Sequence, residues 1–275
     1  LESAEIDSKD SVKSLILVDC ALRIVCQGKT VTVTAKSNNG QQLLSYLHAN
    51  VKSCTATLND TTLTLEYMSA NNDIDEASKL VADNAFSALR TCINSIKSTT
   101  NNPFSLFLGG VFAYDMVANF EQLSDVPDGE NTCPDYVFYL AETLVVIDHQ
   151  KQTTELIGNV FNGSDVHANC FEVGKELERL NTLCDNAAEF SADMQSGECD
   201  VSVDIDDATY CEQVVKLKKN IVDGDIFQVV PSRTFSLPCP DPLHAYSQLK
   251  KQNPSPYMFY MRDEDFALFG ASPES

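Results

Sequence analysis

The order of the expected strands and helices constrains the fold of this chain more than any other feature. Strands are expected in consecutive runs, with helices between the runs rather than after every strand. The pair at 136–147 and 154–161, for example, is followed by a helix at 166–184. Regular alternation of strand and helix would favour a parallel sheet, whereas runs of strands favour an α+β fold with largely antiparallel sheets. The sequence therefore predicts an α+β fold with largely antiparallel sheets.

Hydrophobic periodicity and turn residues give the expected elements. We expect strands at 14–19, 23–27, 30–35, 61–68, 136–147, 154–161, 226–230, 234–237, 257–261 and 266–269. We expect helices at 41–51, 73–97 with a break near 83–84, 166–184, 206–223 and 241–251. Gly28 predicts a hairpin turn and Gly224 a helix end, while 109–110 predict close backbone packing or a turn. Thr209 and Glu212 fit a capping box at the start of a helix.

One stretch, 186–202, has no hydrophobic periodicity and is typical of a linker or surface loop. It predicts a region at 1–185, a linker at 186–204 and a second region at 205–275. The 275 residues are enough for two ordinary domains. The chain starts with Leu-Glu-Ser rather than Met and stops directly after an apolar run, so we expect a fragment of a longer protein.

The charge balance excludes several classes of partner. With 19 Lys and Arg against 40 Asp and Glu, the net charge is −21, which argues against nucleic acid and anionic membranes because both require basic patches. The most apolar uncharged stretch, 103–114, is shorter than the ~20 residues that a membrane span needs. The ten cysteines include no C-x-x-C pair, so we expect reduced thiols in a cytoplasmic protein and no zinc site.

Few side chains suggest chemistry on their own. The four histidines are dispersed, and no nucleophile elbow, phosphate loop or dinucleotide fingerprint is present. Glu142 lies in an apolar strand, where we expect it to face solvent rather than serve as a functional carboxylate. Arg233 follows Pro231-Ser232 and is equally compatible with an anion contact and a surface ion pair.

The segment 253–261 has two readings. Pro254 and Pro256 fix extended geometry, and a strand rich in aromatic and Met side chains follows. Such a stiff edge with apolar walls could hold a flat aromatic ligand. It is also typical of an ordinary core strand, and the residues alone favour that interpretation.

Four segments together resemble the anthranilate synthase component I family of chorismate-utilising enzymes. They are Gly-Asp-Ile-Phe-Gln-Val-Val-Pro-Ser-Arg at 224–233, Phe-Ser-Leu-Pro-Cys-Pro at 235–240, Asn-Pro-Ser-Pro-Tyr-Met-Phe at 253–259 and Phe-Gly-Ala-Ser-Pro-Glu-Ser at 269–275. The opening residues 1–10 and the segments 133–135 and 139–144 fit the same family, closest to its gamma-proteobacterial branch. The ordered string of motifs is specific, although each piece alone would be weak.

The resemblance implies an enzyme that converts chorismate and ammonia to anthranilate and pyruvate, the first step of tryptophan biosynthesis. Ammonia would come from glutamine through a partner glutamine amidotransferase subunit, anthranilate synthase component II, in a heterotetramer. Mg²⁺ is the implied cofactor, with its ligands outside this chain. The implied fold is an α+β antiparallel-sheet sandwich with helices, a chorismate-utilising fold that is incomplete here. The fragment alone is expected to be inactive.

The resemblance also implies feedback inhibition by L-tryptophan, and it reverses the interpretation of 253–261. The inhibitor site carried over from the family comprises Glu2, Ser3, Asn253, Pro254, Ser255, Pro256, Tyr257, Met258 and Phe259. Region 1–185 would then hold part of this site, and 205–275 would begin a truncated catalytic region that binds chorismate. Only Glu274 and its neighbours approach the catalytic residues, so no catalytic residue or metal ligand is assigned to this chain.

Two alternatives stay open. Aminodeoxychorismate synthase component I shares the fold and also opens chorismate with ammonia, but it normally differs in the 228–233 and 253–258 segments. A non-catalytic amino-acid-binding module would require the reading frame to end near Ser275. The sequence beyond Ser275 would separate these alternatives.

Overall fold

The computed structural model describes residues 1–2, 13–68, 78, 82–119, 133–188 and 200–272. The chain forms two compact units, one made of Leu1–Ala188 with Asn253–Ser275 and the other of Glu189–Gln252. Each unit is described by itself. Of the predicted linker 186–204, residues 189–199 lie outside the described part, and its role as a functional boundary stays a prediction.

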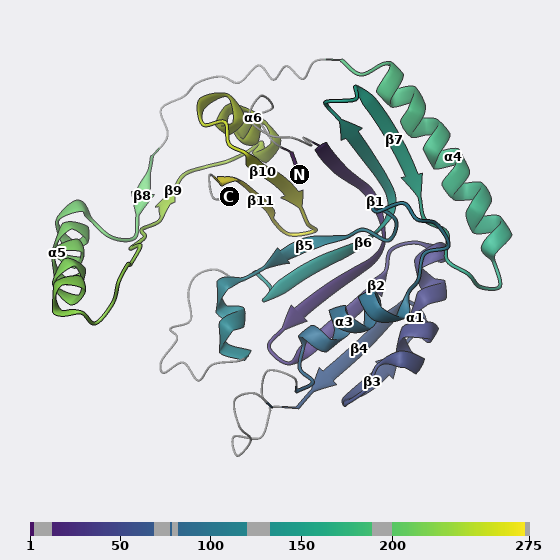
Figure 1. The fold of residues 1–275 in the computed structure, drawn as a ribbon, viewed down its shortest axis with the longest axis horizontal. Coiled ribbons are helices and arrows are strands. Elements are labelled where there is room, and N and C mark those ends of the chain that lie inside the picture. The colour runs from purple at the N-terminus through teal and green to yellow at the C-terminus, as the bar shows by residue number, and fades with distance from the viewer. Residues whose placement is uncertain (3–12, 69–77, 79–81, 120–132, 189–199, 273–275) are drawn as a thin grey trace. The chain divides into compact units, whose positions relative to one another are not determined.

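An antiparallel sheet forms the centre of the first unit (Figure 1). Its strands are β1 (Lys13–Gln27), β2 (Thr30–Ala35), β3 (Cys54–Leu58), β4 (Thr62–Tyr67), β5 (Leu108–Phe112), β6 (Tyr136–Asp148) and β7 (Thr153–Gly158). The order is β3-β4-β2-β1-β6-β5, with β7 also paired to β6. Every pairing in this sheet is antiparallel, which confirms the predicted α+β class.

Strand β1 joins two strands that the sequence predicted separately. It runs without a break from Lys13 to Gln27, and its register against β6 shifts between Leu17 and Leu22. There the Asp19 N–H donates to Thr143 Oγ1 at 3.1 Å instead of to a backbone carbonyl. A bulge of this kind bends a strand without ending it. The predicted turn after β1 is confirmed, with Gly28 at φ +58°.

Helices cover the sheet and close the core. They are α1 (Asn38–Asn50), α3 (Phe86–Ser95) and α4 (Val166–Asp185), with a short 3₁₀ helix at Tyr114–Asn119. Helix α1 buries Leu43, Leu44 and Leu47 and contacts β1 to β4, whereas α4 packs on β6 and β7 as an ordinary surface helix. Of the helix predicted at 73–97, Ser78 and the later part, α3, are helical; 73–77 and 79–81 lie outside the described residues.

Two strands of the large sheet were missed by the sequence patterns. β3 is short, and β5 contains the glycine pair for which close packing or a turn was expected. Close packing is correct: a Cβ on Gly110 would lie 2.1 Å from the Val137 carbonyl oxygen. Only a glycine lets β5 approach β6 at this point.

The second unit contains β8 (Ser202–Val203), α5 (Asp207–Asp223), β9 (Phe235–Ser236) and α6 (Pro242–Gln252). Gly224, at φ +84°, ends α5 as predicted. The predicted capping box is wrong, because Asp206 caps the helix by accepting from the Thr209 N–H at 2.9 Å. The predicted strand 226–230 is also wrong: no described strand pairs with this segment, and Phe227 is fully exposed.

A two-stranded hairpin, β10 (Tyr257–Arg262) and β11 (Ala267–Ser272), completes the first unit. Both strands were predicted, and they pair antiparallel from Tyr257–Ser272 to Arg262–Ala267. In the described ranges of the chain, no helix combines the length and the apolar character needed to cross a membrane.

Candidate functional site

The first residues of the chain pair with strand β10, which lies near the other end of the sequence. The Glu2 N–H donates to the Met258 carbonyl, and the Met258 N–H donates back to Glu2, both at 2.9 Å. Leu1 is paired in the same way with Leu15 of β1, at 2.9 and 2.8 Å. Leu1–Glu2 therefore lies between β1 and β10. This arrangement brings together the two segments that the resemblance assigned to an inhibitor site.

The start of β10 places the other predicted site residues. Met258 and Ser255 are buried, and Ser255 Oγ donates to the Ser272 carbonyl, which joins the two ends of the hairpin. The Tyr257 side chain is half exposed. A stiff extended segment with an accessible aromatic ring is suited to a flat apolar ligand.

The remaining predicted residues are less enclosed. Asn253 and Pro254 are exposed, and Pro256 is partly buried. The Phe259 ring lies over Gly270, where an added Cβ would come within 2.9 Å of it. Ser3 and Glu274 lie outside the described residues.

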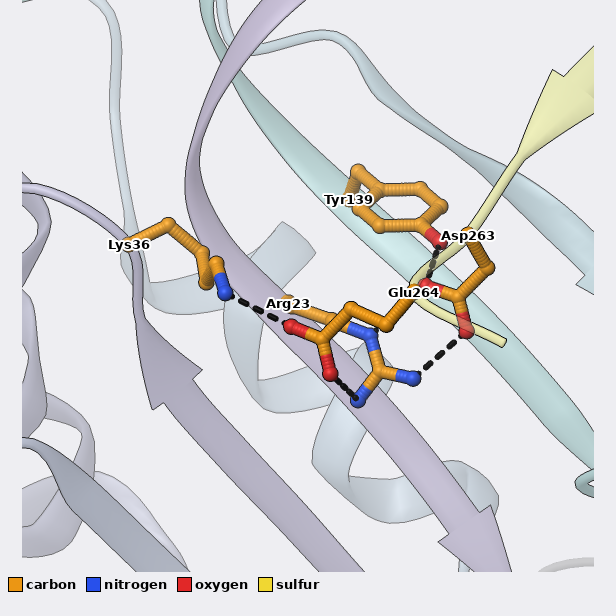
Figure 2. A network of polar contacts seen from close by, with 5 residues as sticks. All are labelled: Arg23, Lys36, Tyr139, Asp263 and Glu264. Carbon is orange, nitrogen blue, oxygen red and sulfur yellow. Dashed lines mark hydrogen bonds and ion pairs between the residues drawn. The ribbon is translucent and has the colours of Figure 1, made fainter. Parts of the chain in front are cut away.

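The turn end of the hairpin is held by a second set of contacts, which the sequence analysis did not anticipate (Figure 2). Arg23 of β1 donates from Nε to Asp263 Oδ1 at 2.8 Å and from Nη2 to Oδ2 at 2.5 Å. Tyr139 of β6 donates its hydroxyl to the same Oδ1. The Asp263 side chain is 2% exposed and that of Arg23 is 15% exposed. We call Arg23, Tyr139 and Asp263 the turn clamp.

The electrostatics of the turn clamp keep its groups in complementary states. Burial acts to raise the pKa of Asp263, but hydrogen bonds from Arg23 and Tyr139 outweigh it and lower that pKa. The hydrogen bond to Asp263 raises the pKa of Arg23, and burial raises the pKa of Tyr139. The clamp is therefore an ionised carboxylate held by a guanidinium and a neutral phenol.

A second ion pair in the same turn is far more open. Lys36 Nζ lies 2.7 Å from Glu264 Oε1, and the Glu264 side chain is 53% exposed. The hydrogen bond from Lys36 is the main cause that lowers the pKa of Glu264. Exposed pairs of this kind contribute little to stability. Glu264 Oε2 also lies 3.9 Å from Arg23 Nη1. The turn thus contains one buried and one exposed carboxylate, adjacent in the sequence.

Glu142 does not face solvent as expected. Its Oε2 accepts from Ser37 Oγ and, at 3.1 Å, from Asn39 Nδ2. Asn39 in turn accepts from the Phe161 N–H at 2.8 Å. Ser37 and Asn39 lie at the start of α1, so the Glu142 carboxylate anchors this end of the helix to β6. The prediction that it has no catalytic role is untouched, but its predicted exposure was wrong.

Arg233 takes part in a surface ion pair. Its Nη1 lies 2.5 Å from Asp207 Oδ1, and its guanidinium is 5.2 Å from the Tyr210 ring centre and 4.6 Å from that of Phe235. Of the two interpretations left open by the sequence, the structure fits the ion pair.

The described residues offer neither disulfides nor a metal centre. Nine cysteines fall within them, and all nine are free thiols. Within the same residues, no group of three or more His, Cys, Asp or Glu side chains could hold a metal ion. These residues do not fit a Mg²⁺ site, and no chemistry of the ion is assigned to them.

Comparison with known proteins gives consistent similarities. The model of the chorismate binding enzyme family matches residues 32–275. Anthranilate synthase component 1 of Vibrio cholerae is 48% identical over 277 residues, and that of Escherichia coli is 44% identical over 283 residues. Both alignments include all of this chain and 52% of the relative, so the chain spans about half the length of these curated relatives.

A solved structure supports the fold. The crystal structure of anthranilate synthase component I from Streptococcus pneumoniae TIGR4 aligns with a TM-score of 0.60 and 19% identity. The alignment covers all of this chain and 54% of that one. The predicted resemblance and the predicted fold class are both confirmed.

Proposed function

The chain belongs to the chorismate binding enzyme family, and on that premise we propose that it is the N-terminal portion of an anthranilate synthase component I. The complete enzyme converts chorismate and ammonia to anthranilate and pyruvate, the first step of tryptophan biosynthesis. Support comes from relatives of that name that are similar over the whole chain. Because the chain spans about half their length, catalysis belongs to the complete protein and the 275-residue chain alone is inactive.

The regulatory part of the proposal is that this chain contributes a site for the inhibitor L-tryptophan. The observation that carries it is the backbone pairing of Glu2 with Met258. The two segments lie far apart in the sequence, yet they lie side by side in the structure. The Tyr257 ring would contact the indole, and the Glu2–Ser3 segment would supply polar atoms for the amino-acid head.

The complete enzyme also requires components beyond this chain. A glutamine amidotransferase subunit would supply ammonia, and the two subunits would form a heterotetramer in the cytoplasm. Mg²⁺ would assist departure of the ring hydroxyl of chorismate, with ligands in the half of the enzyme that this chain does not contain.

The test uses the complete enzyme with ammonium as the nitrogen source, and it follows anthranilate by fluorescence while L-tryptophan is titrated. We expect Tyr257→Ala to raise the half-inhibiting concentration about tenfold, which corresponds to about 1.4 kcal/mol, because an aromatic contact with the indole is lost. Ser3→Ala should shift it in the same direction. Tyr114→Ala is the matched control, since this tyrosine is 91% exposed on another element.

Turnover without inhibitor is measured in parallel, so that loss of enzyme is not mistaken for loss of inhibition. Wild-type sensitivity in both the Ser3 and the Tyr257 variants would contradict the proposed site. Release of aminodeoxychorismate instead of anthranilate would contradict the proposed reaction and support the sister enzyme.

A further inference from the structure

The β10–β11 hairpin is attached to the rest of its unit at two places. At the start of β10, Met258 pairs with Glu2. At the turn that follows β10, the turn clamp joins Asp263 to Arg23 and Tyr139 (Figure 2). An isolated two-stranded hairpin is at best marginally stable in water. The position of β10 therefore depends on these attachments.

The turn clamp is the stronger of the two polar attachments in the turn itself. The Asp263 carboxylate accepts three hydrogen bonds, two of them from the fork of one guanidinium, and it is almost fully buried. If the Asp263 carboxylate is removed, the mostly buried Arg23 guanidinium keeps only the longer contact with Glu264, at 3.9 Å. The neighbouring Glu264–Lys36 pair is exposed and contributes little by comparison.

We propose that Arg23, Tyr139 and Asp263 are positioning residues that set the affinity of the inhibitor site at the opposite end of β10. This inference rests on the proposed function, because it takes L-tryptophan as the ligand. Met258 lies five positions before Asp263, and the strand between them is continuous. A fixed turn therefore fixes the direction of strand β10, and with it the position of residues 255–258 at the other end of the strand.

Loss of the clamp acts on binding through preorganisation. Without it, the hairpin keeps the Glu2–Met258 pairing, and its turn keeps only the exposed Glu264 contacts. The turn then moves more freely, and the binding-competent position becomes one of several. The ligand must then select that position, which lowers its apparent affinity by the fraction of molecules that occupy it. The clamp touches no proposed ligand atom, so its effect reaches the site through the strand.

The experiment titrates L-tryptophan into the complete enzyme by calorimetry and measures inhibition with ammonium as substrate. We expect Asp263→Asn to weaken binding about tenfold, because the Arg23 guanidinium loses the carboxylate that accepts both of its hydrogen bonds. Tyr139→Phe removes one hydroxyl and keeps the ring, and it should weaken binding about threefold. In the double variant, the fold-loss of L-tryptophan affinity should be smaller than the product of the two single fold-losses, since both residues act through one carboxylate.

Two controls separate positioning from general loss of stability. Asp265→Asn changes an exposed carboxylate of the same turn and should leave affinity within about twofold of wild type. Leu63→Ala opens a cavity in β4, away from the hairpin, where the side chain is fully buried. It should lower the melting temperature without weakening L-tryptophan binding.

The outcomes are distinct. Wild-type affinity in both the Asp263 and the Tyr139 variants would overturn the inference while leaving the proposed function intact, and so would an equal loss of affinity in Leu63→Ala. If Asp263→Asn fails to fold, the milder Tyr139→Phe decides. Absence of L-tryptophan binding by the wild-type enzyme would overturn the proposed function and this inference with it.

Discussion

In the unit made of Leu1–Ala188 and Asn253–Ser275, strand β1 carries four side chains without any exposed surface. In the unit Glu189–Gln252, helix α5 has no buried residue among its 17. Strand β1 lies between β2 and β6 and is contacted by α1. The described part of the second unit contains only one further helix and a ladder of two-residue strands.

The two units differ in whether their elements need a neighbouring element for their backbone hydrogen bonds. Helix α5 satisfies its own backbone and is defined by Asp206 at one end and Gly224 at the other. The apolar segment 226–230 would need a neighbouring strand for its backbone hydrogen bonds. No described strand provides one, so the helix forms and the strand does not.

The largest expected effect tests the core of the first unit. Leu22→Ala should lower the free energy of unfolding of the 275-residue chain by about 2–5 kcal/mol, because the side chain is fully buried in β1. Leu237→Ala, the same change at a 55% exposed position of the second unit, should cost less than about 0.5 kcal/mol. Denaturant unfolding measures both, and similar losses would break the comparison.

A smaller effect is expected where two strands of the first unit meet most closely. Gly110→Ala should cost about 1–3 kcal/mol, since the new methyl would overlap the Val137 carbonyl and force β5 away from β6. Gly174→Ala in α4 is the matched control: nothing lies within 4 Å of its added Cβ. In the control, the free energy of unfolding should rise by about 0.5–1 kcal/mol, because alanine has a higher helix propensity than glycine. Changes of the same sign in the free energy of unfolding for Gly110→Ala and Gly174→Ala, measured by denaturant unfolding, would contradict this account.

The two units should also differ in how the pH dependence of stability responds to loss of a carboxylate. The pKa of Asp263 is lowered in the folded state, so its contribution is complete above the unfolded pKa near 4 and is lost as the pH falls through the lower folded value. The stability difference between wild type and Asp263→Asn should therefore shrink when unfolding is measured from pH 7 down to pH 3. Asp207→Asn, at the 90% exposed partner of Arg233, should change stability little. A difference that stays constant down to pH 3 would refute the assignment.

The smallest effect is expected at the most exposed apolar side chain of the second unit. Phe227→Ser should change the unfolding free energy by less than about 0.5 kcal/mol, because the ring is fully exposed in the folded chain. Thermal or denaturant unfolding of the 275-residue chain is the measurement. A loss of several kcal/mol would show that this segment has a core of its own.

Local patterns predicted most of the elements but not the contacts between distant ones. The turn at Gly28 and the helix end at Gly224 follow from backbone conformations that glycine adopts easily, so they were predictable. The bulge in β1 was not, because the register shift depends on the partner strand β6. Strand β3 was missed because its short alternating pattern gives too weak a signal.

The candidate site shows the same limit. The segments at Glu2 and 253–259 were identified only through the resemblance, since the residues alone favoured a core strand. The turn clamp gave no signal at all: Arg23 and Asp263 are 240 positions apart, and each is ordinary in its own surroundings. Such a pair becomes visible only when the sheet brings the two segments together.

The separation of Arg23 and Asp263 has a consequence for the order of events during synthesis. At ~5–20 residues per second, a ribosome needs on the order of 10 to 50 s to translate the 240 positions between them. The strands of the large sheet emerge during that interval, before Asp263 has been synthesised to pair with Arg23. A nascent chain therefore completes the proposed inhibitor site only after the strands of the large sheet have been synthesised, and free tryptophan has no complete site to bind until the hairpin has left the ribosome.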